Sequence, residues 1–239
     1  ISMEGYIYMQ DGGSGKADTV TATYKNKYDL RNGFTINYAA KTNSAKNFET
    51  GRPYHGVKIG NIEARIQLVD KSNIMLVIKV AGATAAKSGS IPAAAVSAGT
   101  YFYDYIDYEL DYDAATKVVT FSMTKGGETN TLTYTDTANA VDVADADVVL
   151  ASNCTWILQN WYNKAKLVGK APVEIPDEPN PEEPEYTNGF TGTAFDFNKN
   201  FVADDWTFSH TQSGISMEGY IYMQDGGSGK ADTVTATYK

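Results

Sequence analysis

Apolar and polar residues alternate with a period of two along most of this chain, which is the pattern of β-strands that bury one face. The clearest pair is 62–68 and 74–80, where the alternation continues on both sides of a polar turn at 70–73. These two segments are expected to form a half-buried hairpin.

The most regular alternation runs from 102 to 112, with apolar or aromatic residues at the even positions except Asp104 and mostly acidic residues at the odd positions. Turns at 113–117 and 125–128 then lead into two further strands. The alanine-rich interval Ala81–Gly99 has small residues and no helical stripe, so it is predicted to be a loop with at most one short helical turn. About a dozen strands joined by short turns predict an all-β, two-sheet antiparallel jelly-roll sandwich.

A repeated stretch organises the chain, because Ile1–Lys25 occurs again without a change at Ile215–Lys239. A fold tolerates substitution at most exposed positions, so physical constraint alone does not produce such identity. The duplication is therefore genetic or introduced in cloning. The chain is either part of a protein made of near-identical tandem repeats or the product of a cloning overlap or permutation.

The clearest boundary is Ala171–Glu185, which holds five of the seven prolines and six carboxylates without a Lys or Arg. Such a segment is expected to be a stiff, solvated linker between repeats. Residues 1–170 would then be the main part of the sandwich, and 186–239 would be the N-terminal strands of the next repeat. The jelly roll is thus circularly out of frame, with its natural order running from 186–239 into 26–170.

Net charge is −9, and the six linker carboxylates account for most of it. The net charge of the rest of the chain predicts no basic surface for nucleic acid and no polybasic face for a membrane. No run approaches the ~20 apolar residues of a membrane span, so this segment is not expected to insert into a bilayer. The single cysteine, Cys154, leaves no intrachain disulfide.

Three phrases carry a resemblance to a known superfamily: TAFDF followed by WTFSH, IDYELDYDAATKVVTFSMTKGG, and WILQNWYNKAKL. They resemble the concanavalin A-like (laminin G/legume-lectin-type) jelly rolls, and the resemblance covers most of the domain. This superfamily includes bacterial adhesin domains, lectins, carbohydrate-binding modules and glycoside hydrolases. The resemblance therefore implies a sandwich fold and, by analogy, a task that involves sugars.

An enzymatic reading rests on Glu109, Asp111 and Asp113, which share one strand face as catalytic carboxylates do in glucanases of this fold. The match fails at its end, where the expected Glu is replaced by an Asp that begins a turn. We therefore interpret the three as a solvated face with Asp113 capping the turn, and we expect no enzyme. His55 and His210 lie far apart without partners at ligand spacing, which argues against a catalytic triad or a zinc site.

Candidate ligand-binding residues are aromatic or amide side chains expected in loops or on exposed faces, where a ring can stack on a sugar. They are Tyr54, His55, Tyr101, Tyr103, Asn160, Trp161 and Tyr162.

No cofactor is expected, but a structural calcium ion is kept as a candidate because oxygen ligands are plentiful. The candidate ligands form two acidic groups, neither with a glycine-punctuated calcium loop: Asp142, Asp145 and Asp147, and Asp204 and Asp205.

The favoured function is an extracellular tandem-repeat domain of a bacterial cell-surface adhesin or fibre that binds glycans or surface proteins in a lectin-like way. Its partners would also include neighbouring repeats, since tandem copies turn a weak contact into avidity. The alternative is a structural stalk repeat without a ligand, assembled head to tail by strand complementation. The two copies of 1–25 compete for one position, so an assembly or filament is expected.

Overall fold

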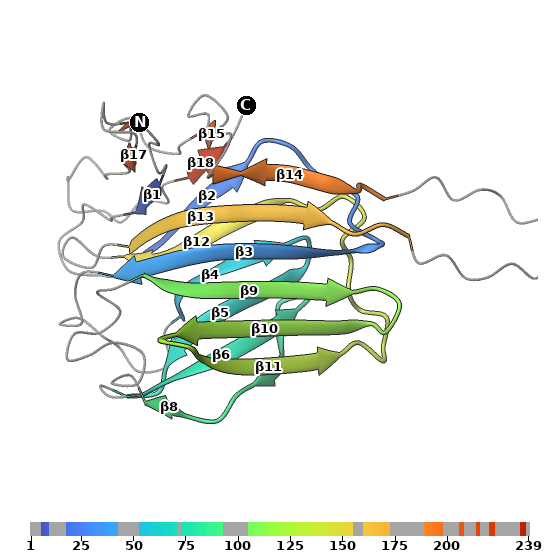
Figure 1. Ribbon diagram of the computed structural model, residues 1–239, viewed down its shortest axis with the longest axis horizontal. Coiled ribbons are helices and arrows are strands. Elements are labelled where there is room, and N and C mark those ends of the chain that lie inside the picture. Colours follow the sequence, from blue (N-terminus) through green and yellow to red (C-terminus); the bar gives the residue numbers. More distant parts are fainter. Residues whose placement is uncertain are drawn as a thin grey trace, which may run out of the picture.

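The computed structural model describes residues 6–9, 18–42, 53–70, 73–92, 105–154, 160–172 and 189–197, with the short strands 206–207, 214–215, 220–222 and 235–237. The strands form two nine-stranded sheets stacked face to face (Figure 1). Within this described part, no helix has the length and apolar character of a membrane span.

The first sheet, sheet A, has the order β11-β10-β9-β3-β13-β1-β17-β16, and β14 also pairs with β13. Its strands are β1 (Tyr6–Met9), β3 (Gly33–Thr42), β9 (Ile106–Asp113), β10 (Val118–Lys125), β11 (Glu128–Thr135), β13 (Asn160–Gly169), β14 (Gly192–Asp196), β16 (Gly214–Ile215) and β17 (Tyr220–Tyr222).

The second sheet, sheet B, has the order β15-β18-β2-β12-β4-β5-β6-β7, and β8 also pairs with β6. Its strands are β2 (Asp18–Tyr24), β4 (Pro53–Ile59), β5 (Ile62–Leu68), β6 (Asn73–Val80), β7 (Ala83–Lys87), β8 (Ile91–Pro92), β12 (Val148–Cys154), β15 (Trp206–Thr207) and β18 (Thr235–Thr237).

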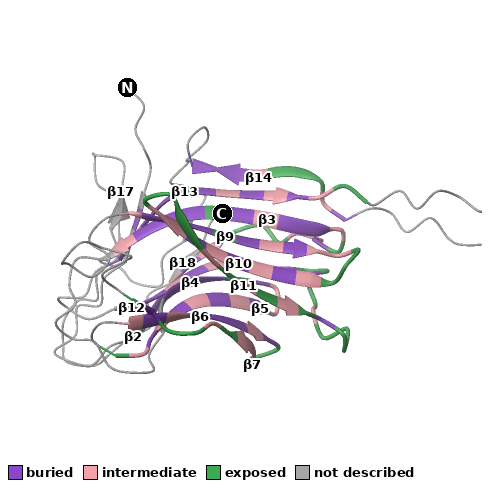
Figure 2. Cartoon of the chain, turned by 60° about the horizontal axis from the view of Figure 1, so that its bottom comes forward, coloured by how far each residue is buried: buried purple, intermediate pink, exposed green. Residues whose placement is uncertain are grey.

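The core lies between the sheets and follows the alternation of the sequence. Every second residue of β5 is buried, and the residues between them are partly exposed, as Figure 2 shows by colour. The predicted hairpin is confirmed, because β5 and β6 pair antiparallel with Ile62 opposite Val80. The alternation of β9 is also confirmed from Ile106 to Asp113.

The prediction of a loop across Ala81–Gly99 is wrong for its described part, because β7 and β8 both pair with β6. In β7, Ala86 lies opposite Ile78 at the edge of sheet B. An edge strand needs only one ladder of backbone hydrogen bonds, so it forms here without an alternating apolar face.

Residues 189–197 pack against the same sandwich. β14 pairs antiparallel with β13, and the Phe190 ring lies 4.6 Å from the Tyr28 ring. Phe195 is 7% exposed, and its ring centroid lies 4.7 Å from that of Tyr24. Residues 189–197 therefore belong to the same sandwich as the strands before them.

The two identical copies lie side by side in both sheets (Figure 1). The first copy provides β1 beside β13 and β2 beside β12. The second copy pairs parallel with the first and in register, with Tyr6 opposite Tyr220 and Thr21 opposite Thr235. A shift by one residue would turn the buried face outward, so identical sequences favour this register.

Candidate functional site

A hollow of about 370 Å³ lies on the outer face of sheet B, across β2, β12, β4 and β5. It is lined by Thr19, Thr21, Thr23, His55, Gly56, Val57, Lys58, Glu63, Arg65, Val149, Ala151 and Ser152. These residues come from segments far apart in the sequence that the sheet brings into neighbouring positions.

Small residues in one cross-strand row form the floor of this hollow. Thr21 lies opposite Ala151, which lies opposite Gly56 on its other side, and Gly56 lies opposite Arg65. Gly56 has no side chain, so the surface dips between the threonines of β2 and the long side chains of β5. The hollow therefore results from the distribution of side-chain size along one row.

One wall of the hollow is charged. The Arg65 Nη1 donates to Glu63 Oε1 at 2.9 Å, and its Nη2 donates to Gln67 Oε1 at 3.5 Å. Lys79 Nζ lies 3.8 Å from Glu63 Oε2, and the exposed Lys58 lies opposite Glu63 on β4. Because the side chains on either side hold Arg65, its guanidinium has a defined position at the edge of the hollow.

The floor is fixed from beneath by the Tyr162 hydroxyl. It accepts from the Gly56 N–H at 3.1 Å and from the Ser152 Oγ at 3.0 Å, and it donates to the Ala151 carbonyl at 2.6 Å. These bonds join β13 of sheet A to β4 and β12 of sheet B. The hydroxyl thus links the two sheets directly below the hollow.

Tyr162→Phe is expected to lower the free energy of unfolding by about 2 kcal/mol, because the buried Gly56 N–H and Ser152 hydroxyl lose their acceptor. Urea unfolding followed by tryptophan fluorescence measures the change. Tyr134→Phe is the matched control, since the Tyr134 hydroxyl has a long, 3.4 Å bond to Asp136. If both substitutions lowered the free energy of unfolding equally, the Tyr162 hydroxyl would not stabilise the contact between the sheets as proposed.

The structure places several of the predicted ligand residues in the core rather than on an exposed face. His55, Asn160 and Tyr162 are 1%, 0% and 0% exposed. The His55 ring meets the rings of Tyr108 and Tyr162 edge-on at 5.0 and 6.0 Å. Burial lowers the pKa of His55 from 6.5 to about 3, so the imidazole is neutral at physiological pH.

Trp161 lies on sheet A, away from the hollow, and is partly exposed. The Lys41 ammonium lies 5.1 Å from the centre of the Trp161 ring and 4.8 Å from that of Tyr105. This arrangement is a cation–π cluster. The side chain of Tyr54, and both Tyr101 and Tyr103, lie outside the described residues, so their roles stay predictions.

The three carboxylates of the enzymatic reading are engaged in structural contacts or exposed. Asp113 Oδ1 accepts from the Ala115 and Thr116 N–H groups, and the bond from Thr116 lowers the pKa of Asp113. The interpretation of Asp113 as a turn cap is confirmed. Asp111 accepts from Thr35 Oγ1 at 2.6 Å and from Lys170 Nζ at 2.8 Å.

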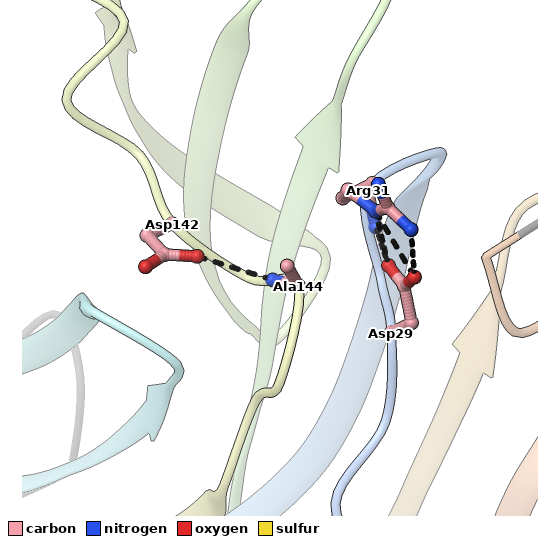
Figure 3. A network of polar contacts seen from close by, with 4 residues as sticks. All are labelled: Asp29, Arg31, Asp142 and Ala144. Atoms are coloured by element: carbon pink, nitrogen blue, oxygen red, sulfur yellow. Dashed lines mark hydrogen bonds and ion pairs between the residues drawn. The ribbon is translucent and has the colours of Figure 1, made fainter. Parts of the chain in front are cut away.

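In the first acidic group kept as a calcium candidate, each carboxylate contacts a protein donor or cation. Asp142 Oδ1 accepts from the Ala144 N–H (Figure 3). The Lys27 ammonium lies 3.2 Å from Asp145 and 3.6 Å from Asp147. Among the described residues no three carboxylate, His or Cys side chains converge as metal ligands, and Asp204 and Asp205 lie outside that part.

Of the residues that line the hollow, sequence reasoning identified His55 and missed the others. The alternation of 62–68 places Glu63 and Arg65 on the outward face of the predicted hairpin, but it does not connect them with Thr21 on a strand about forty residues earlier. The signal available in the sequence was a basic residue on the outer face of a hairpin. Its neighbours across the sheet depend on strand order, which the sequence does not specify.

The fold matches solved lectin structures. The lectin from Bauhinia forficata in complex with GalNAc aligns with a TM-score of 0.50 at 11% identity, covering 64% of this chain and 80% of the lectin. Lectin I-B4 from Griffonia simplicifolia, in its metal-free form, aligns with a TM-score of 0.52 at 8% identity, covering 68% of this chain and 92% of the lectin.

At these identities the likeness shows the fold, and the predicted concanavalin A-like jelly-roll sandwich is confirmed. No protein-family model matches the sequence, and no curated protein matches it.

Proposed function

We propose that this chain is a carbohydrate-binding, lectin-like domain from an extracellular tandem-repeat adhesin or fibre on a bacterial surface. The observation that carries the proposal is the hollow on sheet B, within a fold that known lectins share. Its 370 Å³ volume falls in the range of small-ligand sites. Its threonine hydroxyls and charged wall offer the hydrogen bonds that sugar hydroxyls need.

The proposal describes a binding domain rather than an enzyme. In the glucanase-like strand, Asp111 accepts a hydrogen bond from Lys170, and Asp113 accepts one from the Ala115 N–H of the following turn. These contacts support a structural task for both carboxylates. Glycans or surface proteins would be the partners, and neighbouring repeats would supply avidity through the linker. Nucleic acid and membrane insertion do not enter the proposal.

A specific observation favours a second candidate, a structural stalk repeat without a ligand. The second copy of the repeated stretch pairs in register with the first in both sheets. A copy from another chain could take the same position and join chains head to tail, which predicts a filament.

A glycan array tests the first proposal against the second. The 239-residue chain is compared with a chain lengthened to three repeats, and both are shown to be folded by circular dichroism. Glycan binding that strengthens at least about tenfold with three repeats supports the adhesin, because linked sites raise the effective concentration. If neither folded protein binds any glycan, and light scattering shows assemblies that grow with time, the stalk repeat is favoured.

A further inference from the structure

The outer face of sheet B is cationic at the hollow, whereas one strand of sheet A, β9, has an acidic outer face. On sheet A, the outward side chains of β9 are acidic: Asp107, Glu109, Asp111 and Asp113. On sheet B, the described charged side chains on the outer face of β4, β5 and β6 are Lys58, Glu63, Arg65 and Lys79. A chain with a net charge of −9 therefore has a locally cationic surface at the hollow.

Among the described outward side chains of β4, β5 and β6, the one carboxylate, Glu63, already has two cationic neighbours. Glu63 accepts from Arg65 at 2.9 Å through one oxygen, and Lys79 lies 3.8 Å from the other. Lys58 adds a third cation on the neighbouring strand. One carboxylate cannot neutralise three cations, so the wall keeps an excess of positive charge for a ligand.

The donors of Arg65 also point to an anion. Its side chain is 18% exposed, and its Nε is buried without a hydrogen-bond partner in the described part of the chain. Because this Nε is closed to solvent, a ligand in the hollow would reach Arg65 through its Nη groups. A ligand with an anionic oxygen beside Arg65 would offset its positive charge and accept from the remaining guanidinium N–H groups.

The opposite wall is neutral. Thr19, Thr21 and Thr23 lie on the same face of β2, and strand geometry spaces them by about 7 Å. Each hydroxyl can donate and accept, as sugar hydroxyls do. A ligand that spans the hollow would thus meet hydroxyl groups on one side and cations on the other.

We propose that the hollow binds an acidic saccharide, whose carboxylate or sulfate lies against Lys58 and Arg65 and whose hydroxyls lie against the threonines of β2. The inference rests on the proposed carbohydrate binding and specifies the ligand class of that site. Uronic acids and sulfated sugars share the required chemistry.

Calorimetry with three probes tests the inference: a tetrasaccharide of galacturonic acid, a sulfated galactose tetrasaccharide and the neutral galactose tetrasaccharide. We expect an acidic probe to bind at least about tenfold more tightly than the neutral one. Raising the salt from about 50 mM to about 500 mM should reduce that advantage, because ions screen the exposed Lys58.

Lys58→Gln should weaken binding of the acidic probe about fivefold and of the neutral probe less than about twofold. Lys164→Gln, at an exposed lysine of β13 in the other sheet, is the matched control and should change neither. Urea midpoints of both variants verify that they remain folded. Preference for the carboxylate or the sulfate identifies the source of the negative charge.

Equal affinity for neutral and acidic probes, with no effect of Lys58→Gln, overturns the inference but leaves carbohydrate binding intact. An equal loss in the Lys164→Gln variant also overturns it, because binding would then follow net charge alone. Failure of folded protein to bind any saccharide, on the array as well, removes the proposed function together with the inference.

Discussion

Gly56→Ala is expected to lower the free energy of unfolding by about 3 kcal/mol, because a methyl group at this position would point into the neighbouring strand β5. A Cβ at this position would lie 2.3 Å from the Ala64 carbonyl oxygen and 2.7 Å from the Arg65 Cβ. The nearest atom belongs to the backbone of β5, so β4 and β5 would have to separate. Chemical denaturation measures the change through the urea midpoint.

The matched control is Gly89→Ala. A Cβ at Gly89 would meet nothing within 4 Å, so this variant should stay within about 0.5 kcal/mol of the unchanged protein. Because the strand separation would also deform the hollow, Gly56→Ala should weaken saccharide binding under conditions where it is folded. A Gly56→Ala variant as stable as Gly89→Ala would show that β4 and β5 lie further apart than described.

Acid is expected to destabilise the fold through His55. The folded pKa of about 3 lies below the ordinary value of 6.5, because burial disfavours the charged imidazole. An unfolded chain therefore binds a proton at His55 as the pH falls below about 6.5, whereas the folded chain does not. The stabilising contribution is present above this pH and is lost progressively toward pH 3.

The size of the effect follows from about 1.4 kcal/mol per pH unit, so lowering the pH from 7 to 4 should cost about 3 kcal/mol through His55 alone. Carboxylates such as Asp113 add their own acid sensitivity, so the comparison uses His55→Phe as the control without an imidazole. Urea unfolding at both pH values should show a loss about 3 kcal/mol larger in the unchanged protein. Parallel losses in the two proteins would exclude His55 as the cause.

The fold was predictable because it depends on alternation, and alternation is local. The hairpin of β5 and β6 and the strand β9 are visible in sequence windows of about eight residues. β7 was missed because its small residues show no buried face. An edge strand is specified by the free backbone groups of its neighbour, which a window of sequence does not contain.

The candidate site was harder to predict, for two physical reasons. Aromatic and histidine side chains are large and apolar enough to fill a core, and His55 and Tyr162 do so. The hollow, in contrast, exists because Gly56 and Ala151 are small and lie in register with Arg65. Register between distant strands is a property of the whole sheet, so no short sequence motif predicts it.

The parallel pairing of the two identical copies also bears on how the chain folds. Either copy offers β13 and β12 the same side chains. Strand packing alone therefore does not distinguish the observed arrangement from one in which the second copy pairs with β13 and β12 and the first copy lies outside it. About 155 residues separate Ile7 from Tyr162, against about 59 between Tyr162 and Ile221, and loop closure favours the nearer copy by about 1 kcal/mol.

Exchange of the two copies would require both sheets to open at one edge. We therefore expect refolding to yield two topological isomers that interconvert slowly, and in a longer array the order of folding would determine which copy belongs to which domain.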